Sequence, residues 1–401
     1  MEIVKIALLI LLMILLIRKN MAIGVVLIFS AMIVGFMFAE RIIDLPLFFY
    51  RSMTSYIFFR ILAIIYSVFL IASVLRAGDI NKMLEGIVNL VPKLKIAMII
   101  PPMTIGLLPM PGGAMLPAPI VGSIGNKLNM KPEHKVYVNF WFRHVWEYAW
   151  PLYPGLILTV SILKIEMKTI VMSQFYLSII AIAAGLVFLF TVIEGRNQTR
   201  EMHPAKALLR FVSGIWPILI IIILILATSI PVEFIVLAIA FLYWLMARIQ
   251  WMKKLKMLYN CITIETILLV VGLVLFKDFL QYSNALEQFV AAFPASDFLP
   301  LLLIIMLPLI VGFLTGINQG YVAIALPVLV PFLHTAGSVD MLKVAVFYAS
   351  GFAGILLSPA HLCLSLTKEY FRADFNKVYK YLIPSTIPIF IIPIIIYLLR
   401  R

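Results

Sequence analysis

The chain has 401 residues, of which 64 % are hydrophobic and 12 % are charged. Soluble proteins carry about 25 % charged residues, so this composition excludes a soluble enzyme and indicates an integral membrane protein. The formal net charge is +14, but the basic residues lie in short stretches between apolar segments rather than in one patch. This distribution excludes a nucleic-acid partner and favours anionic lipid headgroups, so the lipid bilayer is the first expected partner.

The amino terminus and the cysteines narrow the class further. An apolar run follows Lys5, but Arg18 and Lys19 stand where a signal peptide has small residues, so we interpret this run as the first membrane helix. The two cysteines, Cys261 and Cys363, are too few for a disulfide framework or a cysteine-rich metal site. We therefore expect a multi-pass protein of the cell (inner) membrane that has no cofactor.

Predicted membrane segments follow one another along the whole chain. A helix needs roughly 20 residues to cross the hydrocarbon core, and the apolar segments in chain order are 3–17, 21–39, 55–75, 96–125, 134–162, 170–193, 212–230, 231–247, 261–280, 298–334, 341–367 and 380–400. Two of them are too long for one crossing and are interrupted, at 109–113 by Pro-Met-Pro-Gly-Gly and at 315–320 by Thr-Gly-Ile-Asn-Gln-Gly. We predict that 96–125 and 298–334 are re-entrant hairpins.

The distribution of Lys and Arg tests this prediction, because cytoplasmic loops of membrane proteins carry an excess of both. With both hairpins re-entrant, 21 basic residues fall on one face of the membrane and 9 on the other. If both segments cross instead, the split is 13 against 17. The re-entrant arrangement gives the clearer asymmetry, and it places both termini outside the cytoplasm.

The same order of segments then occurs twice: three crossings, an interfacial arm, a hairpin and two more crossings, the first of them broken. Five crossings in each half are an odd number, so the two halves are predicted to be inverted repeats. Pro151 and Pro359 interrupt the broken helices, each 16 residues after a lysine, Lys135 or Lys343. The expected fold class is an all-α polytopic membrane protein made of these two repeats.

The interruptions themselves predict a binding site. Irregular backbone at membrane depth is tolerated only where it is buried in protein or lines a cavity, and broken helix ends near the midplane can hold ions and substrates. Glycines let a ligand approach the main chain, and hydroxyl and amide groups can coordinate Na⁺ or donate to a carboxylate. The alternative is a tight turn that its own polar groups satisfy. The candidate residues at the two tips are Pro111, Gly112, Gly113, Thr315, Gly316, Asn318, Gln319 and Gly320.

The first broken helix places Asn139, Arg143 and Glu147 on one face, with Trp150 and Pro151 after them. Ionisable groups inside a membrane are usually functional or paired. Arg143 is a candidate clamp for a substrate carboxylate and Glu147 a candidate ligand of a coupling ion. A salt bridge between them that only holds the helix in place is the alternative.

Other candidates lie next to these breaks. His144 is a candidate proton carrier, while Ser358, Pro359 and His361 occupy the second break, where binding, proton transfer and local capping are all open. A Na⁺ site is expected at Thr315, Asn318 and Ser358. Two ionisable residues in the outer crossings, Arg60 and Glu265, are interpreted as packing or snorkelling residues.

The segment order, together with Gly-Leu-Leu-Pro-Met-Pro-Gly-Gly-Ala at 106–114 and Gly-Phe-Leu-Thr-Gly at 312–316, resembles the ion transporter superfamily. Its members include divalent-anion/sodium symporters, gluconate permeases and the large membrane subunits of tripartite (TRAP) carboxylate transporters. The chain looks most like an uncharacterised prokaryotic family of about ten-helix membrane proteins placed in that superfamily. The sodium/dicarboxylate symporters carry Ser-Asn-Thr at each tip, and neither motif is intact here.

The resemblance implies an elevator mechanism, in which hairpins and broken helices form a mobile transport domain that slides against a scaffold of outer helices. Thr315 and Asn318 match the polar character of the family's tip, Gly112 and Gly113 its close backbone approach, and Pro151 and Pro359 the helix breaks. A homodimer is an assembly common in the superfamily. The expected boundaries are 1–95 for the scaffold and arm (79–94) of the first repeat, 96–193 for the first half of the transport domain, 194–211 for a cytoplasmic inter-repeat loop, 212–297 for the scaffold and arm (283–294) of the second repeat, and 298–401 for the second half of the transport domain.

The expected function is secondary active transport of a small organic anion, a carboxylate, by symport with Na⁺ or H⁺ as coupling ion. The alternative is a cation/proton antiporter that uses Glu147 and His361. A purely structural subunit of a tripartite system is a further alternative. An intramembrane enzyme is the most distant, because the chain has neither a His-Glu-x-x-His pair nor a Gly-x-Ser-x-Gly elbow.

Overall fold

A computed structural model describes residues 2–19, 21–38, 42–78, 84, 88, 91–110, 112–193, 204–282, 298–335 and 337–400 of the chain. Within these residues the fold is helical, apart from two short antiparallel strands, β1 (His334–Thr335) and β2 (Ser338–Val339). Five helices in this part of the chain are long and apolar enough to cross a membrane. The predicted class, an all-α polytopic membrane protein, is confirmed.

The first half of the chain has the predicted order of helices, with one addition. A short helix, α3, lies between the second and third predicted crossings, and Pro46 in its first turn favours a helix start there. The elements are α1 (Glu2–Arg18), α2 (Ile23–Phe38), η1 (Ile42–Asp44), α3 (Leu45–Met53), α4 (Tyr56–Ala77), α6 (Leu94–Ile105), η2 (Gly113–Met115), α7 (Ala118–Lys127), α8 (Pro132–Arg143), α9 (Pro154–Leu163) and α10 (Met167–Thr191).

The second half repeats this order. An additional helix, α13, precedes the third crossing, where the amphipathic stretch Trp251–Asn260 is rich in lysine. The elements are α11 (Pro204–Ala227), α12 (Val232–Met246), α13 (Trp251–Asn260), α14 (Ile264–Tyr282), α16 (Phe298–Thr315), α17 (Asn318–Leu329), η3 (Val330–Leu333), α18 (Met341–Leu356), α19 (Leu362–Phe371) and α20 (Phe375–Leu399).

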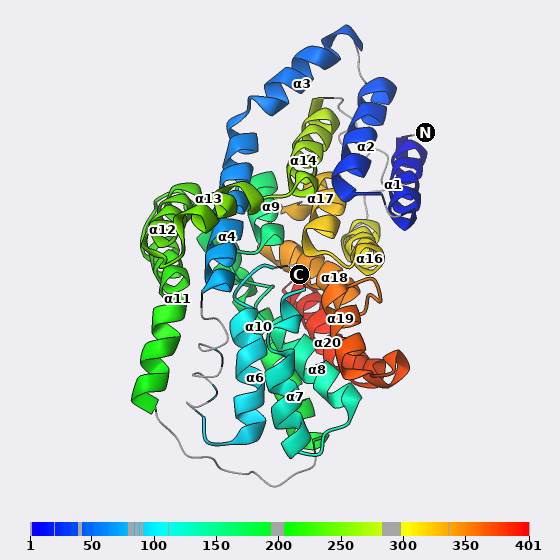
Figure 1. The fold of residues 1–401 in the computed structure, drawn as a ribbon. Helices are drawn as coiled ribbons and strands as arrows, with labels where there is room; N and C mark the ends of the chain where they lie inside the picture. Colours follow the sequence, from blue (N-terminus) through cyan, green and yellow to red (C-terminus); the bar gives the residue numbers. More distant parts are fainter. Residues whose placement is uncertain are drawn as a thin grey trace.

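Both long segments are helical hairpins. Helices α6 and α7 pack against each other on either side of the Pro-Gly tip, and α16 and α17 do the same around residues 316–317 (Figure 1). The helix that follows each hairpin is interrupted, between α8 and α9 over residues 144–153 and between α18 and α19 over 357–361. The breaks are therefore wider than the single prolines that predicted them.

The outer helices of the two halves pack reciprocally. The second helix of the first half, α2, lies along α14, and the second helix of the second half, α12, lies along α4 (Figure 1). The first contact is close because Gly24 and Gly272 face the partner's main chain, where a Cβ atom would overlap it. Reciprocal packing of this kind is typical of two halves related by an internal pseudo-two-fold axis.

Arg60 on α4 forms an ion pair with Glu233 on α12. Its Nε lies 3.2 Å from the Glu233 carboxylate on α12, and the Tyr56 hydroxyl donates to the same carboxylate. Glu233 is buried and Arg60 is half-buried, so this ion pair joins α4 to α12 at the edge of their contact. Arg60 is thus one partner of a pair between the two halves.

The two expected interfacial arms fall largely outside the described residues. Of the first arm, 79–94, the structure describes Leu84, Val88 and residues 91–94, whereas the second, 283–294, lies wholly outside. The expected inter-repeat loop, 194–211, is described only from Pro204, where α11 begins. Its last residues are therefore helical.

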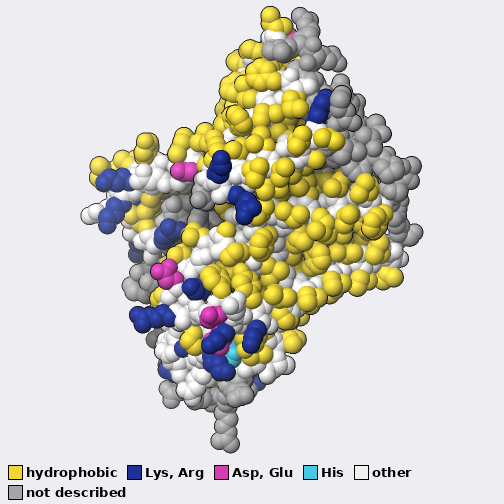
Figure 2. Space-filling view, turned by 90° about the vertical axis from the view of Figure 1, so that its right-hand side faces the viewer, with side chains coloured by type: hydrophobic (Ala, Val, Ile, Leu, Met, Phe, Trp, Pro, Cys, Tyr) yellow, Lys and Arg dark blue, Asp and Glu magenta, His cyan; other side chains and the backbone are white. Residues whose placement is uncertain are grey.

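Hydrophobic side chains cover a broad band on one face of the molecule, and Lys and Arg gather below this band and at one side of it (Figure 2). Exposed apolar residues recur along the long helices, for example Met306, Ile310 and Phe313 on α16 and Ile387 and Ile391 on α20. Large exposed apolar surface is costly in water and favourable in lipid, so this band is the expected lipid-facing surface.

Candidate functional site

The two hairpin tips and the two helix breaks meet around one cavity of about 190 Å³. Met110 and Gly112 of the first tip line it, as do Gly316 and Asn318 of the second. Residues from both breaks complete the wall, together with Phe69 of α4. Four segments that the sequence marked separately as irregular therefore form one site.

Each tip contains a glycine with positive φ. The values are +65° at Gly112 and +62° at Gly316, in the left-handed region that favours glycine. At Gly316 a Cβ atom would also lie 2.7 Å from the backbone nitrogen of His361, so the second tip and the second break are in contact through their main chains. The close approach of a ligand to the backbone at Gly112 and Gly113 stays a prediction.

Arg143, the last residue of α8, joins the first tip to the first break. It is only 3 % exposed. Its Nη1 lies 2.7 Å from Glu147 Oε1, and its Nη2 donates to the main-chain oxygen of Met110 at 3.1 Å. Nη1 also donates to the Tyr153 hydroxyl at 3.3 Å. The predicted Arg143–Glu147 salt bridge is present, and it forms part of the cavity wall.

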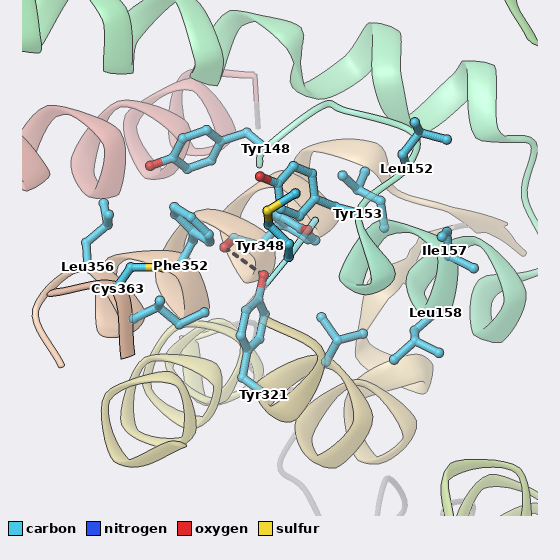
Figure 3. Packing of buried hydrophobic residues seen from close by; sticks show 14 of the residues in the cluster. Tyr148, Leu152, Tyr153, Ile157, Leu158, Tyr321, Tyr348, Phe352, Leu356 and Cys363 are labelled. Carbon is cyan, nitrogen blue, oxygen red and sulfur yellow. Dashed lines mark hydrogen bonds between the residues drawn. The ribbon is translucent and has the colours of Figure 1, made fainter. Parts of the chain in front are cut away.

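Glu147 continues this network to the second tip. The Asn318 amide donates to Glu147 Oε2 at 3.2 Å, and the Tyr348 hydroxyl of α18 lies 3.2 Å from both Asn318 Oδ1 and the Glu147 main-chain oxygen. Figure 3 shows the rings of Tyr153, Tyr321 and Tyr348 close together here. Buried polar contacts therefore run from the first tip, through Arg143 and Glu147, to the second.

Two histidines from the two breaks meet beside this network. His144 Nε2 lies 2.9 Å from His361 Nε2, and the Cys363 thiol lies within 4.8 Å of both. All three residues line the cavity. From the sequence, the two histidines were separate candidates and Cys363 was only a member of an apolar segment. The spacing His-x-Cys at 361–363 was the available signal.

Three helices also begin at the cavity. Pro154 starts α9, Asn318 starts α17 and Leu362 starts α19, and each of these residues is part of the lining. The amino-terminal end of a helix carries a partial positive charge and free N–H groups. Three such ends, together with the Arg143 guanidinium, favour an anion in this cavity.

Several expected site residues lie close to the cavity rather than in its wall. Of the expected Na⁺ set, Asn318 lines the cavity, whereas the Thr315 hydroxyl donates to the Val311 carbonyl oxygen in its own helix and the Ser358 hydroxyl accepts the Ala360 N–H. Gln319 lines the cavity and is half-buried.

The remaining candidates have packing roles or lie at the surface. Trp150 donates to the Leu107 carbonyl oxygen behind the first tip, and Pro151 lies buried within the first break. Gly113 and Gly320 are tightly packed, because a Cβ atom on Gly113 would overlap Met110 and Arg143 and one on Gly320 would overlap Ile23 and Thr315. Pro359 is exposed, and Pro111 lies outside the described residues.

A second cavity of about 420 Å³ adjoins the first, and Ile317 and Gln319 line both. Its other wall comes from the α1–α2 connection and from the start of α14. Glu265, which the sequence analysis took for a packing or snorkelling residue, lines this cavity. The second cavity thus lies between the second tip and part of the outer helices.

This fold and cavity define an all-α, multi-pass membrane protein with a buried polar centre between two hairpin tips and two interrupted helices. The model of a family described as "Protein of unknown function (DUF401)" matches residues 3–399, and the chain belongs to this family. No curated protein sequence matches the chain.

Proposed function

We propose that the protein is a secondary active transporter of a small organic anion. The observation that carries this proposal is the convergence of three helix amino-terminal ends and the buried Arg143 on one cavity enclosed by both hairpin tips. Hydrogen-bond donors and positive dipole ends at one site favour a carboxylate. A cavity of about 190 Å³ suits a small substrate.

The charges in the wall favour an anion over a cation. Glu147 is the acidic residue of the cavity wall among the described residues, and Arg143 neutralises it at 2.7 Å. Arg143 Nε is buried against Gly113 of the first tip and makes no hydrogen bond within the described part of the chain, so not every donor of the guanidinium is used by the protein. The antiporter alternative needs Glu147 as a free cation ligand, which this pairing disfavours.

An elevator movement is the proposed route of transport. Hairpins α6–α7 and α16–α17 and the broken helices enclose the cavity, while the reciprocal pairs α2–α14 and α4–α12 form the proposed scaffold. The larger cavity between the second tip and the α1–α2 connection offers the space through which a substrate would leave the site on one side of the membrane. In an inverted repeat, movement of the enclosed unit opens the other side.

Uptake by reconstituted vesicles tests this function. Purified protein in vesicles is given a panel of radiolabelled mono- and dicarboxylates under an inward Na⁺ gradient, an inward H⁺ gradient or neither. We expect one gradient to drive accumulation of at least one carboxylate, and the gradient that does so identifies the coupling ion. Protein-free vesicles are the control.

Two results would contradict the proposal. One is uptake that is independent of both gradients for every carboxylate in the panel. The other is release of protons on addition of Na⁺ in the absence of any organic solute, which the antiporter alternative predicts instead.

A further inference from the structure

The histidine pair in the cavity wall has an unusual arrangement of hydrogen bonds. His144 Nδ1 lies 2.6 Å from the main-chain oxygen of Phe140, and His361 Nδ1 lies 2.5 Å from that of Gly316. A carbonyl oxygen only accepts hydrogen bonds, so each Nδ1 must carry a hydrogen. In a neutral imidazole the opposite nitrogen, Nε2, then presents a bare lone pair.

The two Nε2 atoms face each other at 2.9 Å. Two lone pairs at this distance repel, so the arrangement requires a cation between the rings, either a shared proton or a metal ion. A shared proton needs only the two nitrogens. The structure supplies a third donor as well, because Cys363 Sγ lies within 4.8 Å of both and is 4 % exposed.

We propose that His144, His361 and Cys363 bind a first-row transition-metal ion of the Zn²⁺ type. Imidazole nitrogen and thiolate sulfur are the ligands that such ions prefer, with bonds of about 2.0–2.1 Å to nitrogen and about 2.3 Å to sulfur. A tetrahedral site places its two nitrogens roughly 3.3 Å apart. Metal binding would therefore move the rings slightly apart from 2.9 Å and bring Cys363 Sγ, now within 4.8 Å of both nitrogens, to about 3.6 Å from each.

The surroundings of the cluster are those of a metal site. Histidine ligands of metals usually donate their second N–H to a carbonyl or carboxylate oxygen, which fixes the tautomer that binds the metal. Phe140 O and Gly316 O take this role here. The histidines are held by different segments, since His144 follows α8 and His361 precedes α19.

The ion has one position left for a ligand from the cavity. Three protein donors leave a tetrahedral ion with its fourth site open, as in sites that exchange a ligand. All three donors line the cavity, and the charged residues beside them, Arg143 and Glu147, pair with each other. A divalent ion with one thiolate adds a net positive charge, so an anion is the class of ligand that fits the open position.

Titration of the purified full-length chain with Co²⁺ tests the site without any transport measurement. The protein is stripped with a chelator in detergent and titrated while the absorption spectrum is recorded. We expect one equivalent of Co²⁺ to bind with the visible bands of tetrahedral coordination and a near-ultraviolet thiolate-to-cobalt charge-transfer band. Zn²⁺ should displace it.

Matched variants locate the site. Cys363→Ser should abolish the charge-transfer band, and His361→Gln should weaken binding by roughly tenfold or more. Cys261→Ser and His134→Gln, which change the same residue types outside the cluster, should bind as the parent does. Size-exclusion chromatography of each variant checks the fold.

Failure of the unaltered chain to bind Co²⁺ stoichiometrically would overturn the proposal, as would a charge-transfer band that persists in a folded Cys363→Ser protein. In the first case the two nitrogens share a proton, which nitrogen-15 spectra of labelled histidine would show as coupling across the hydrogen bond. Since no step of this experiment requires transport, failure of the metal site and failure of the proposed function are distinguishable.

Discussion

Replacing Arg143 with methionine should lower the free energy of unfolding by about 3–5 kcal/mol, because Glu147 would be left as an unpaired buried charge. The two groups lie 2.7 Å apart, and their side chains are 4 % and 6 % exposed. Arg143→Met also removes the hydrogen bond to the first tip at Met110. Thermal and denaturant unfolding in detergent measure the loss, and transport should be abolished.

A double replacement separates the structural role of Arg143 from its proposed role in binding. Arg143→Met together with Glu147→Met removes both charges, so most of the lost stability should return. Transport should stay absent, because the cavity no longer has the guanidinium that is proposed to bind the anion. Should the double variant accumulate carboxylate at the parental rate, Arg143 would be a structural residue alone, and the anion proposal would lose its main support.

Gly316→Ala should prevent transport. It should also lower the free energy of unfolding by more than the cost of a left-handed backbone conformation alone. A non-glycine residue in the left-handed region costs about 1–2 kcal/mol. At Gly316, with φ of +62°, the new Cβ atom would also meet the backbone of His361 at 2.7 Å. The second tip must then move away from the second break, which opens the cavity wall.

Gly337 provides the matched control for this prediction. Its φ is +80°, but beyond its own chain neighbours nothing in the described residues lies within 4 Å of the position of a Cβ atom. Gly337→Ala therefore carries the backbone strain alone, and transport should continue at close to the parental rate. If both alanine variants behave alike in unfolding and uptake measurements, contact between tip and break has no special role.

Interruptions of apolar segments predicted where the site residues would come from. Proline and glycine within long hydrophobic runs end helices locally, so the positions of both hairpin tips were readable without a structure. The Arg143–Glu147 pair was readable as well, because residues four apart meet on one helix face. These signals depend only on residues that are close together in the sequence, and they predicted the positions of the two hairpin tips, the two helix breaks and the Arg143–Glu147 pair.

Contacts between the two halves could not be read in this way. His144 and His361 are 217 residues apart, and Glu147 and Asn318 are 171 apart, so no local pattern links them. Cys363 lies in an apolar stretch and looks like a core residue in the sequence. It lies beside two histidines only because the first break, with His144, packs against the second break. The ion pair of Arg60 with Glu233 depends in the same way on α4 lying against α12.

The opposed hairpins are the central claim of this account, and labelling of their ends tests it most directly. Single cysteines are introduced at four exposed positions. Lys93→Cys and Lys127→Cys mark the ends of the first hairpin, and Phe298→Cys at the start and Ser338→Cys just past the end mark those of the second. The parent chain, whose own cysteines are buried, is the control for an impermeant maleimide.

We expect the first two positions to react only from the cytoplasmic side of oriented vesicles and the last two only from the opposite side. Both ends of each hairpin would then lie on one face, with the two tips meeting between the faces around the cavity. Reaction of Lys93→Cys and Lys127→Cys from opposite sides would show that the first segment crosses the membrane, and it would contradict the shared binding site.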